Sequence, residues 1–210
     1  MIFLTKKLEF PNTNLANNDG VLAIGGDLST ERLILAYKSG IFPWYNQGEP
    51  IIWYAPKKRM VLFPNELKIS KSMKQIIKKD SFKITYNQNF KAVINQCKTI
   101  NRNDQFGTWI TDEMEESYIK LHKLGIAKSV EVWQHNKLIG GLYGIDLEHI
   151  FCGESMFSLV SNASKMGFIA LTEKLKKENY KLVDCQVYND HLASLGAREI
   201  NRDDFMKFLK

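Results

Sequence analysis

The most constraining stretch of this chain is a strand-like run, residues 150–158 (IFCGESMFS), that carries a carboxylate among apolar residues. Successive side chains of a strand point to opposite faces. Strict alternation places Glu154 and Met156 on one face of this strand. It places Phe151 and Phe157 on the other. A carboxylate in mid-run breaks the apolar pattern, and such breaks mark candidate sites.

A second run, residues 181–189 (KLVDCQVYN), has the same property. Its alternation groups Asp184, Gln186 and Tyr188 on one face and apolar residues on the other. Two interpretations stay open with equal weight at this point. The carboxylates of Glu154 and Asp184 either belong to a functional site or form ion pairs with Lys or Arg inside an ordinary sheet.

The composition describes a folded protein without membrane segments. The 210 residues are 44% hydrophobic and 25% charged, which suits one large domain or one domain with a small annex. No apolar run approaches the roughly 20 residues that span a bilayer, and the N-terminus lacks the pattern of a signal peptide. Cys97, Cys152 and Cys185 have no paired spacing and are expected to be reduced packing residues. We therefore expect a cytoplasmic protein without a membrane partner, whose net charge of +6 modestly favours an anionic partner.

The first sixty residues differ from the rest of the chain. The string IFPWYNQGEPIIWYAPKKR (residues 41–59) crowds aromatic residues around three prolines, which favours short strands and loops over helix. Before it, the pattern predicts a helix at residues 31–39. A boundary near Pro64 predicts a small N-terminal domain at residues 1–63 and a larger domain at residues 64–210.

The larger domain alternates helical and strand patterns. Asn87 and Thr111 are the expected caps of two of its helices, and residues 101–107 are an expected loop. The patterns predict helices at about 70–79, 88–97, 112–124, 162–178, 191–195 and 202–209, and strands at about 82–86, 129–133, 137–145, 150–158 and 181–188. This order predicts an α/β (α+β) fold in which the larger domain is acetyltransferase-like (GNAT-type), with a mixed sheet and substrates that meet near its splayed centre.

One predicted helix carries a stripe of positive charge. Residues 70–79 place apolar side chains on one helical face and lysines on another. The basic side chains are Lys71, Lys74, Lys78 and Lys79. Considered alone, such a stripe is about three times more often a solvated face than a binding site.

The residues leave three chemistries open. The first is an acyl transferase, although the position where such folds open their long helix with a glycine loop for coenzyme A reads SLVSNASKMG. The second is a hydrolase with a Cys or Ser nucleophile and His191 or His149 as base, which lacks a recognisable nucleophile motif. The third is a non-enzymatic RNA-binding module. The histidines lack the spacing of metal ligands, so no metal is expected.

Long strings then favour one family. They are DGVLAIGGDLS, AYKSGIFPWYNQGEPIIWYAPKKR, GTWI, LHKLG, SVEVW, GGLYGI, FCGESMFS, NASK and LVDCQVYNDHLASLGA, and they run from about residue 18 to the C-terminus. The chain strongly resembles the leucyl/phenylalanyl-tRNA–protein transferases. Strings of this length are far more specific than a short motif.

The resemblance implies an aminoacyltransferase. Such enzymes move leucine or phenylalanine, and methionine poorly, from aminoacyl-tRNA to the N-terminal Arg or Lys of a protein, which marks that protein for degradation through the N-degron pathway. No cofactor is implied, and a tRNA ester as donor would explain the missing coenzyme A loop. We expect a monomer. The runner-up is a relative that uses another aminoacyl-tRNA or another acceptor.

The resemblance also implies roles for individual residues. Asp184, Gln186 and Glu154 are the implied catalytic residues, with Asp184 acting either through the Gln186 amide or directly on the acceptor. Leu142 stands where a methionine is expected, so the preference between leucine and phenylalanine could differ slightly. The implied donor pocket consists of Leu142, Phe151, Met156 and Val183, and Asn189 is a further substrate-binding residue. The residues implied to lie by the terminal adenosine are Trp53, Trp109 and Tyr118. The residues implied to contact the tRNA acceptor stem are Lys71, Lys74, Lys78 and Lys79.

Overall fold

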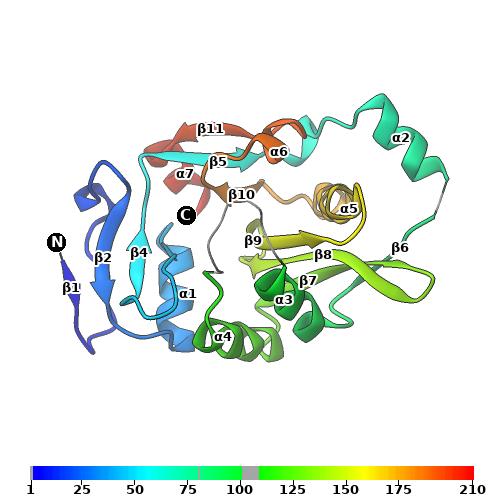
Figure 1. The fold of residues 1–210 in the computed structure, drawn as a ribbon. Helices are drawn as coiled ribbons and strands as arrows, with labels where there is room; N and C mark the ends of the chain where they lie inside the picture. The colour runs from blue at the N-terminus through cyan, green and yellow to red at the C-terminus, as the bar shows by residue number, and fades with distance from the viewer. Residues whose placement is uncertain (1, 80, 101–108) are drawn as a thin grey trace.

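The computed structural model describes residues 2–79, 81–100 and 109–210. Within these ranges the chain builds two sheets, a small one near the N-terminus and a large mixed one (Figure 1). The helices in the described ranges include none with the length and apolar character needed to cross a membrane.

The small sheet contains four strands among the described residues, in the order β1, β2, β4, β3. Helix α1 (Thr30–Lys38) packs beside it and begins at Ser29, whose hydroxyl accepts the N–H of Arg32. This confirms the helix predicted at 31–39, and the proline-rich string forms short strands as expected. The strands are β1 (Phe3–Leu4), β2 (Val21–Gly25), β3 (Phe42–Pro43) and β4 (Ile52–Tyr54), with a short 3-10 helix η1 at Thr13–Leu15.

The large sheet follows the order β11, β5, β10, β9, β8, β7, β6 in the described part of the chain. Neighbouring strands are antiparallel except β9 and β10, which are parallel and are joined through helix α5 (Ala163–Lys177). The strands are β5 (Lys58–Leu62), β6 (Lys83–Tyr86), β7 (Ala127–Gln134), β8 (Lys137–Asp146), β9 (Ile150–Ser158), β10 (Leu182–Gln186) and β11 (Arg198–Asn201). Strand β5 precedes residue 64 yet pairs within this sheet, so the change of sheet falls between β4 and β5.

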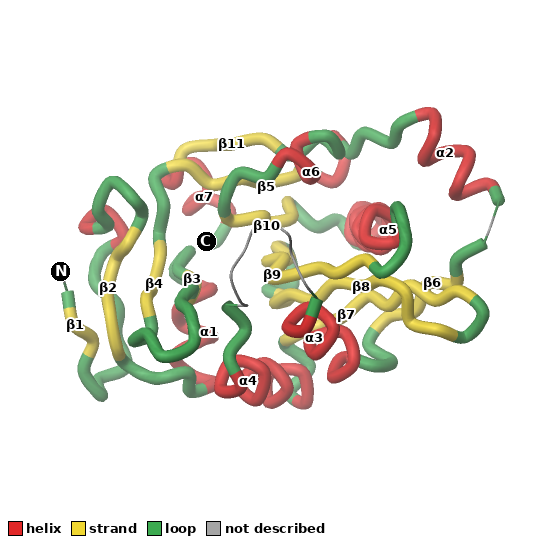
Figure 2. Tube along the Cα trace, in the orientation of Figure 1, coloured by secondary structure: helices red, strands yellow, loops and turns green. Residues whose placement is uncertain are grey.

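Helices cover both faces of the large sheet (Figure 2). On one face, α3 (Phe90–Thr99) and α4 (Asp112–Lys123) form a core that continues into the small sheet, and we call it the first core. On the other face, α5 and α2 (Lys71–Lys78) form the second core. The remaining short helices are η2 (Pro64–Glu66), α6 (Asp190–Ala193) and α7 (Arg202–Phe208).

Most of the predicted elements of the larger domain are confirmed, and two details are not. Thr111 caps α4 as predicted, because its hydroxyl accepts the N–H of Met114 at 3.2 Å. The predicted cap of α3 was wrong, since Asn89 accepts the N–H of Ala92 while Asn87 adopts a left-handed conformation with φ of 58°. Strand β11 was not predicted. The loop expected at 101–107 lies outside the described residues.

The centre of the large sheet is splayed between β9 and β10. The two strands pair over Leu182–Asp184 and Ile150–Cys152. Glu154 and Gln186 come two residues after the last pair on each strand, where the strands have separated. On the neighbouring strand, a Cβ at Gly140 would lie 2.6 Å from the Cβ of Ala163, so the start of α5 lies close against β8. The fold thus leaves a gap between β9 and β10 with a helix beside it.

Candidate functional site

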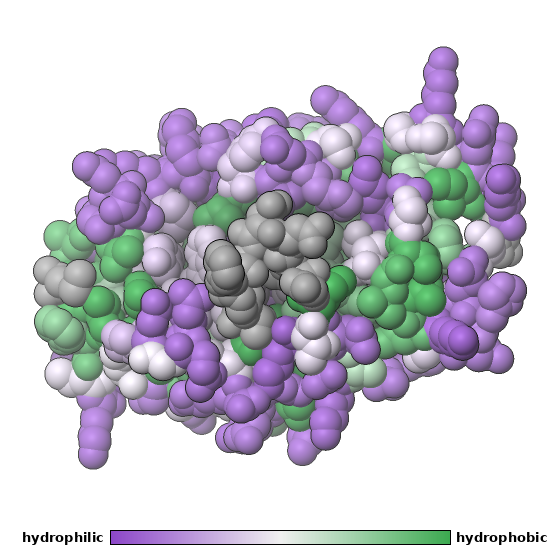
Figure 3. All heavy atoms as spheres, viewed as in Figure 1, coloured by the Kyte–Doolittle hydropathy of each residue, from purple (hydrophilic) through white to green (hydrophobic). Residues whose placement is uncertain are grey.

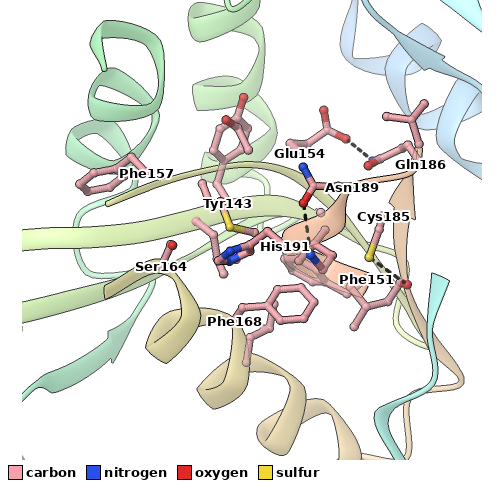
Figure 4. A pocket seen from close by; sticks show the side chains of 18 of the residues that line it. Tyr143, Phe151, Glu154, Phe157, Ser164, Phe168, Cys185, Gln186, Asn189 and His191 are labelled. Atoms are coloured by element: carbon pink, nitrogen blue, oxygen red, sulfur yellow. Dashed lines mark hydrogen bonds between the residues drawn. The ribbon is translucent and has the colours of Figure 1, made fainter. Parts of the chain in front are cut away.

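A cavity of about 480 Å³ opens at this splayed centre (Figure 4). Its inner end is apolar, and its wall at the strand ends carries Glu154 and Gln186. The apolar lining comes from β8, β9, β10, α5 and α6. It includes Leu142, Phe151, Met156, Phe168, Leu171, Val183 and Leu192. A cavity of this size and mixed lining is typical of small-molecule sites.

A β-bulge in β9 sets the direction of Glu154. Ser155 pairs with Tyr143 and Gly153 pairs with Gly144, so Glu154 is an extra residue without a partner on β8. An extra residue locally breaks strand alternation and re-aims its side chain. The carboxylate turns toward the first core, where its Oε2 accepts the hydroxyl of Tyr118 at 3.0 Å.

The bulge corrects two face assignments made from alternation. Met156 packs with the second core and therefore does not share a face with Glu154. Phe151 belongs to the second core and Phe157 to the first, so these rings lie on opposite faces. The predictions failed because a strict period of two has no place for the extra residue.

A second bulge positions Gln186 on β10. Asp184 pairs with Val61 and Gln186 with Met60, which leaves Cys185 as the extra residue. Gln186 adopts φ of 57°, a left-handed conformation that costs a non-glycine residue on the order of 1 kcal/mol or more. Its Nε2 donates to Oε1 of Glu154 at 3.2 Å and closes the gap between the strands (Figure 4).

Asp184 lies behind Gln186 in a buried ion pair with Arg59 of β5. The guanidinium donates from Nε to Oδ1 at 2.8 Å and from Nη2 to Oδ2 at 2.6 Å, and both side chains are at most 2% exposed. Oδ1 of Asp184 also accepts the backbone N–H of Gln186 at 3.0 Å. Arg59 donates in addition to the carbonyl of Gly40 and stacks against the ring of Phe42. Asp184 therefore anchors the backbone of Gln186 and makes its strongest contacts with Arg59.

Two buried tyrosines complete the surroundings of Glu154. Tyr118 donates to the carboxylate, and the hydroxyl of Tyr37 is hydrogen-bonded to that of Tyr118. Burial raises the pKa of Glu154 to about 7, while the nearby hydroxyls of Tyr37 and Tyr118 act in the opposite direction. A carboxyl group with a pKa near neutrality can exchange a proton during a reaction at cellular pH.

The structure brings most of the predicted substrate-binding residues together. Leu142, Phe151, Met156 and Val183 all line the apolar end, and Trp109 and Asn189 line other parts of the cavity wall. The side chain of Asn189 also caps α6, where its Oδ1 accepts the N–H of Leu192 at 3.2 Å.

Other predicted residues lie apart from the cavity. Trp53 is 0% exposed in the first core, where its indole N–H donates to the carbonyl of Gly25 at 2.8 Å. Tyr118 is buried behind Glu154. The predicted lysines, Lys71, Lys74, Lys78 and Lys79, are exposed on α2 and the turn after it. Hydrophilic side chains cover much of the visible face of the molecule, including parts of the end that carries α2 (Figure 3).

Sequence reasoning missed several residues of the site. Arg59 ends a Lys-Lys-Arg run that resembled a solvated basic patch, and its burial depends on a partner 125 positions away. Tyr37 and Trp44 belong to the string AYKSGIFPWY, to which we assigned no role in a site. Trp44 is 37% exposed and lines the cavity. The aromatic content of that string was the available signal, but it does not say which ring faces outward.

The described residues do not support a thiol or metal site. All three cysteines are buried and none forms a disulfide bond, as expected. Burial raises the pKa of Cys152 and of Cys185 well above the usual range, so neither thiol is prepared to act as a nucleophile. Burial also lowers the pKa of His191, whose ring lines the cavity. Groups of three His, Cys, Asp or Glu side chains that could hold a metal ion do not occur in residues 2–79, 81–100 and 109–210.

Comparisons with known proteins agree over the whole chain. A family model described as leucyl/phenylalanyl-tRNA protein transferase matches residues 61–210, and the model of the N-terminal domain of that family matches residues 26–57. A leucyl/phenylalanyl-tRNA–protein transferase of Flavobacterium johnsoniae is 67% identical over 210 residues, which are 100% of this chain and 99% of that protein. The one from Flavobacterium psychrophilum is 61% identical and covers 100% of both chains.

Solved structures include acetyltransferases among the matches. An aminoglycoside acetyltransferase from an uncultured soil metagenomic sample matches with a TM-score of 0.41 and 16% identity, covering 63% of this chain and 89% of that one. A GCN5-related N-acetyltransferase from Kribbella flavida matches with a TM-score of 0.36 and 6% identity, covering 79% and 58%.

The class of protein follows from these findings. The family model that covers residues 61–210 and the relatives that match the full chain are all transferases, so this protein is an enzyme of the transferase class. The chain belongs to the leucyl/phenylalanyl-tRNA–protein transferase family.

Proposed function

We propose that this protein transfers leucine or phenylalanine, and methionine poorly, from aminoacyl-tRNA to the N-terminal Arg or Lys of acceptor proteins. The product has a new peptide bond and is marked for degradation through the N-degron pathway. The observation that carries the proposal is the single cavity wall in which an apolar end meets Glu154 and Gln186. A donor side chain would enter the apolar end, and the reacting carbonyl would then lie by the polar wall.

The apolar end suits an aliphatic or aromatic side chain. Leu142, Phe151, Met156 and Val183 supply aliphatic and aromatic surface without a charged group. Such a pocket selects apolar side chains over polar ones, but it separates similar apolar side chains by only about 1–3 kcal/mol. Acceptance of both leucine and phenylalanine is consistent with this limit.

The polar wall suits an acceptor whose attacking α-amine belongs to a residue with a positively charged side chain. Since Nε2 of Gln186 is engaged with Glu154, the amide oxygen of Gln186 is the atom left to accept a hydrogen bond from the attacking α-amine. Glu154 supplies negative charge close to the same place and would receive the Arg or Lys side chain of the acceptor.

The chemistry requires positioning more than activation. An aminoacyl ester is already reactive, and an α-amine with a pKa of about 7.7–8.0 is partly neutral at cellular pH. The amine nitrogen forms a bond to the ester carbonyl carbon, the bond from that carbon to the ribose oxygen breaks, and the proton lost by the amine ends on the ribose oxygen. Gln186 orients the amine, and the ion pair of Asp184 with Arg59 holds Gln186 in place.

The tRNA would meet the enzyme at two further places. Trp44 and Trp109 line the cavity and could stack on the terminal adenosine, whereas Trp53 is buried away from it. The exposed lysines of α2, Lys71, Lys74, Lys78 and Lys79, would contact phosphates of the acceptor stem. Phosphate contacts of this kind make binding weaken steeply with salt and depend little on tRNA sequence.

The proposal is tested by transfer of labelled leucine from Leu-tRNA to a peptide with N-terminal Arg. An otherwise identical peptide with N-terminal Ala and a reaction with acetyl-coenzyme A run beside it. We expect transfer to the Arg peptide only, with tRNA affinity that falls as salt rises.

Each other outcome has a definite meaning. Transfer to both peptides would remove the acceptor role of Glu154. Acetylation would replace the tRNA ester by coenzyme A as donor. Absence of both reactions, with tRNA binding retained, would overturn the proposed transfer.

A further inference from the structure

Two buried phenols and a carboxylate form a chain of hydrogen bonds that runs from the first core to the large sheet. Tyr37 comes from α1 and Tyr118 from α4, and the two hydroxyls are hydrogen-bonded to each other. Tyr118 is bonded to Oε2 of Glu154 at 3.0 Å, and Gln186 to Oε1 at 3.2 Å. The chain ends at the cavity wall, whereas both phenols lie outside the cavity lining.

The direction of the chain follows from the donors available. An ionised carboxylate only accepts, so the hydroxyl proton of Tyr118 is directed to Glu154. The proton between the two phenols must then come from Tyr37. Burial raises the pKa of both tyrosines well above the usual range, so both remain donors at any physiological pH.

The two tyrosines are buried and make almost no contact with solvent. They are 1% and 0% exposed, and a hydroxyl removed from water requires a partner to offset its desolvation. Phenylalanine would fill the same apolar space without this requirement. A buried row of two hydroxyls that ends at one carboxylate therefore points to a role for that carboxylate.

Other charges around Glu154 largely balance one another. Arg59 favours its ionised form and Asp184 opposes it, and the two are paired at 2.6 Å. The titratable and charged groups that face Glu154 are Tyr37 from α1, Tyr118 from α4, Arg59 from β5, Cys152 from β9 and Asp184 from β10. Within this set, Tyr118 donates a hydrogen bond to the carboxylate, and Tyr37 donates to Tyr118 behind it.

We propose that Tyr118, supported by Tyr37, is a positioning residue that holds Glu154 ionised and aimed along the cavity wall toward Gln186. In this arrangement the carboxylate faces the cationic acceptor. Its Oε2 is held by Tyr118, and its Oε1 holds the amide of Gln186. The inference rests on the proposed function for its catalytic consequence. The effect on Glu154 itself does not depend on which substrate is used.

The first measurement is the pKa of Glu154 in the full-length protein. It is obtained from the pH dependence of the ¹³C resonances of labelled glutamate carboxyl groups. Glu154→Gln assigns the resonance. Tyr118→Phe removes a hydrogen-bond donor and should move the titration midpoint upward by about one pH unit. Tyr37→Phe should move it less and in the same direction. Tyr180→Phe is the matched control, because its hydroxyl bonds to Asp146 and takes no part in the chain.

The second measurement is the pH profile of transfer to the Arg peptide. A midpoint raised from about 7 by one pH unit leaves about a fifth of the ionised Glu154 at pH 7, so Tyr118→Phe should lose about fivefold in rate there. At pH 9 the loss should fall below about 1.5-fold, since the carboxyl is ionised in both proteins. A loss of packing or folding would lower the rate equally at both pH values.

The two proposals fail in different ways. A folded Tyr118→Phe variant with an unchanged titration midpoint for Glu154 would overturn the positioning role, whatever the activity of the enzyme. A wild-type enzyme without transfer to the Arg peptide would overturn the proposed function, while a shifted midpoint would still support the hydrogen-bond chain.

Discussion

The two ends of the cavity are built in different ways. The apolar end is built by regular neighbouring strands and the helix packed on them, with Leu142 opposite Met156 and Phe151 opposite Asp146 in ordinary register. The polar wall is built where regular pairing fails, at one bulge that frees Glu154 and another that precedes Gln186. Recognition of an apolar side chain needs only close packing. The polar groups of the wall need directions that a regular strand does not provide, and a bulge provides them.

The polar wall also carries the larger internal costs. It holds a half-buried carboxylate with a raised pKa, a non-glycine residue at φ of 57°, and a fully buried ion pair. Such features persist when the surrounding structure holds them in place, and they gather at functional sites. The comparison therefore predicts that changes at the polar wall have larger effects than changes at the apolar end.

The largest expected effect comes from breaking the ion pair beneath the polar wall. Arg59→Met leaves Asp184 buried without its partner, which should lower the free energy of unfolding by about 3–5 kcal/mol. Urea unfolding measures the loss. Arg198→Met is the matched control, because its pair with Glu66 is about half exposed and should contribute less than about 1 kcal/mol. Equal losses in the two variants would contradict the contrast.

The same ion pair shows where the sequence stops being informative. The alternative that both carboxylates form ion pairs holds for Asp184, and the structure gives Glu154 phenol and amide partners instead. Spacing within a strand could not separate these cases, because the deciding residues, Arg59 and Tyr118, lie 125 and 36 positions away. Local patterns carry no information about such distant partners.

Other parts of the fold were within reach of the sequence. Helices α2, α4 and α5 and strands β7, β8 and β9 follow from hydrophobic periodicity and caps, which are local properties. The four apolar residues of the donor pocket came from resemblance, and the structure brings them together in the cavity. Short β11 and both bulges depend on partners in other strands, so periodicity alone could not reveal them.

A change in the chemistry of the polar wall should have the next largest effect. Gln186→Ala removes the amide that bonds to Glu154, and it should lower kcat by about 10²–10³-fold while the Kd for tRNA changes by less than about threefold. Gln186→Gly is the companion variant, since glycine suits a positive φ. It should be equally inactive but more stable than the alanine variant by on the order of 1 kcal/mol. An unchanged kcat in either variant would remove Gln186 from the mechanism.

The raised pKa of Glu154 should make stability depend on pH. Burial raises this pKa from 4.5 to about 7, so the folded state holds the proton more tightly than the unfolded state does between these values. The contribution of Glu154 to stability is therefore lost as pH rises from about 4.5 to about 7, by on the order of 1–3 kcal/mol. Glu154→Gln should remove this loss. Its unfolding free energy relative to wild type should be greater at pH 8 than at pH 5, and a difference independent of pH would argue against the raised pKa.

The smallest expected effect is at the apolar end. Leu142→Met changes shape but hardly volume, so the free energy of unfolding should change by less than about 1.5 kcal/mol. An unbranched side chain alters the contour of the donor pocket, and the ratio of kcat/KM for Phe-tRNA and Leu-tRNA should change by less than about tenfold. Leu175→Met, at a buried position of α5 away from the cavity, should leave the ratio unchanged. A change near 100-fold at position 142 would mean that this end controls the reacting geometry as well, and the separation of the two ends would then be wrong.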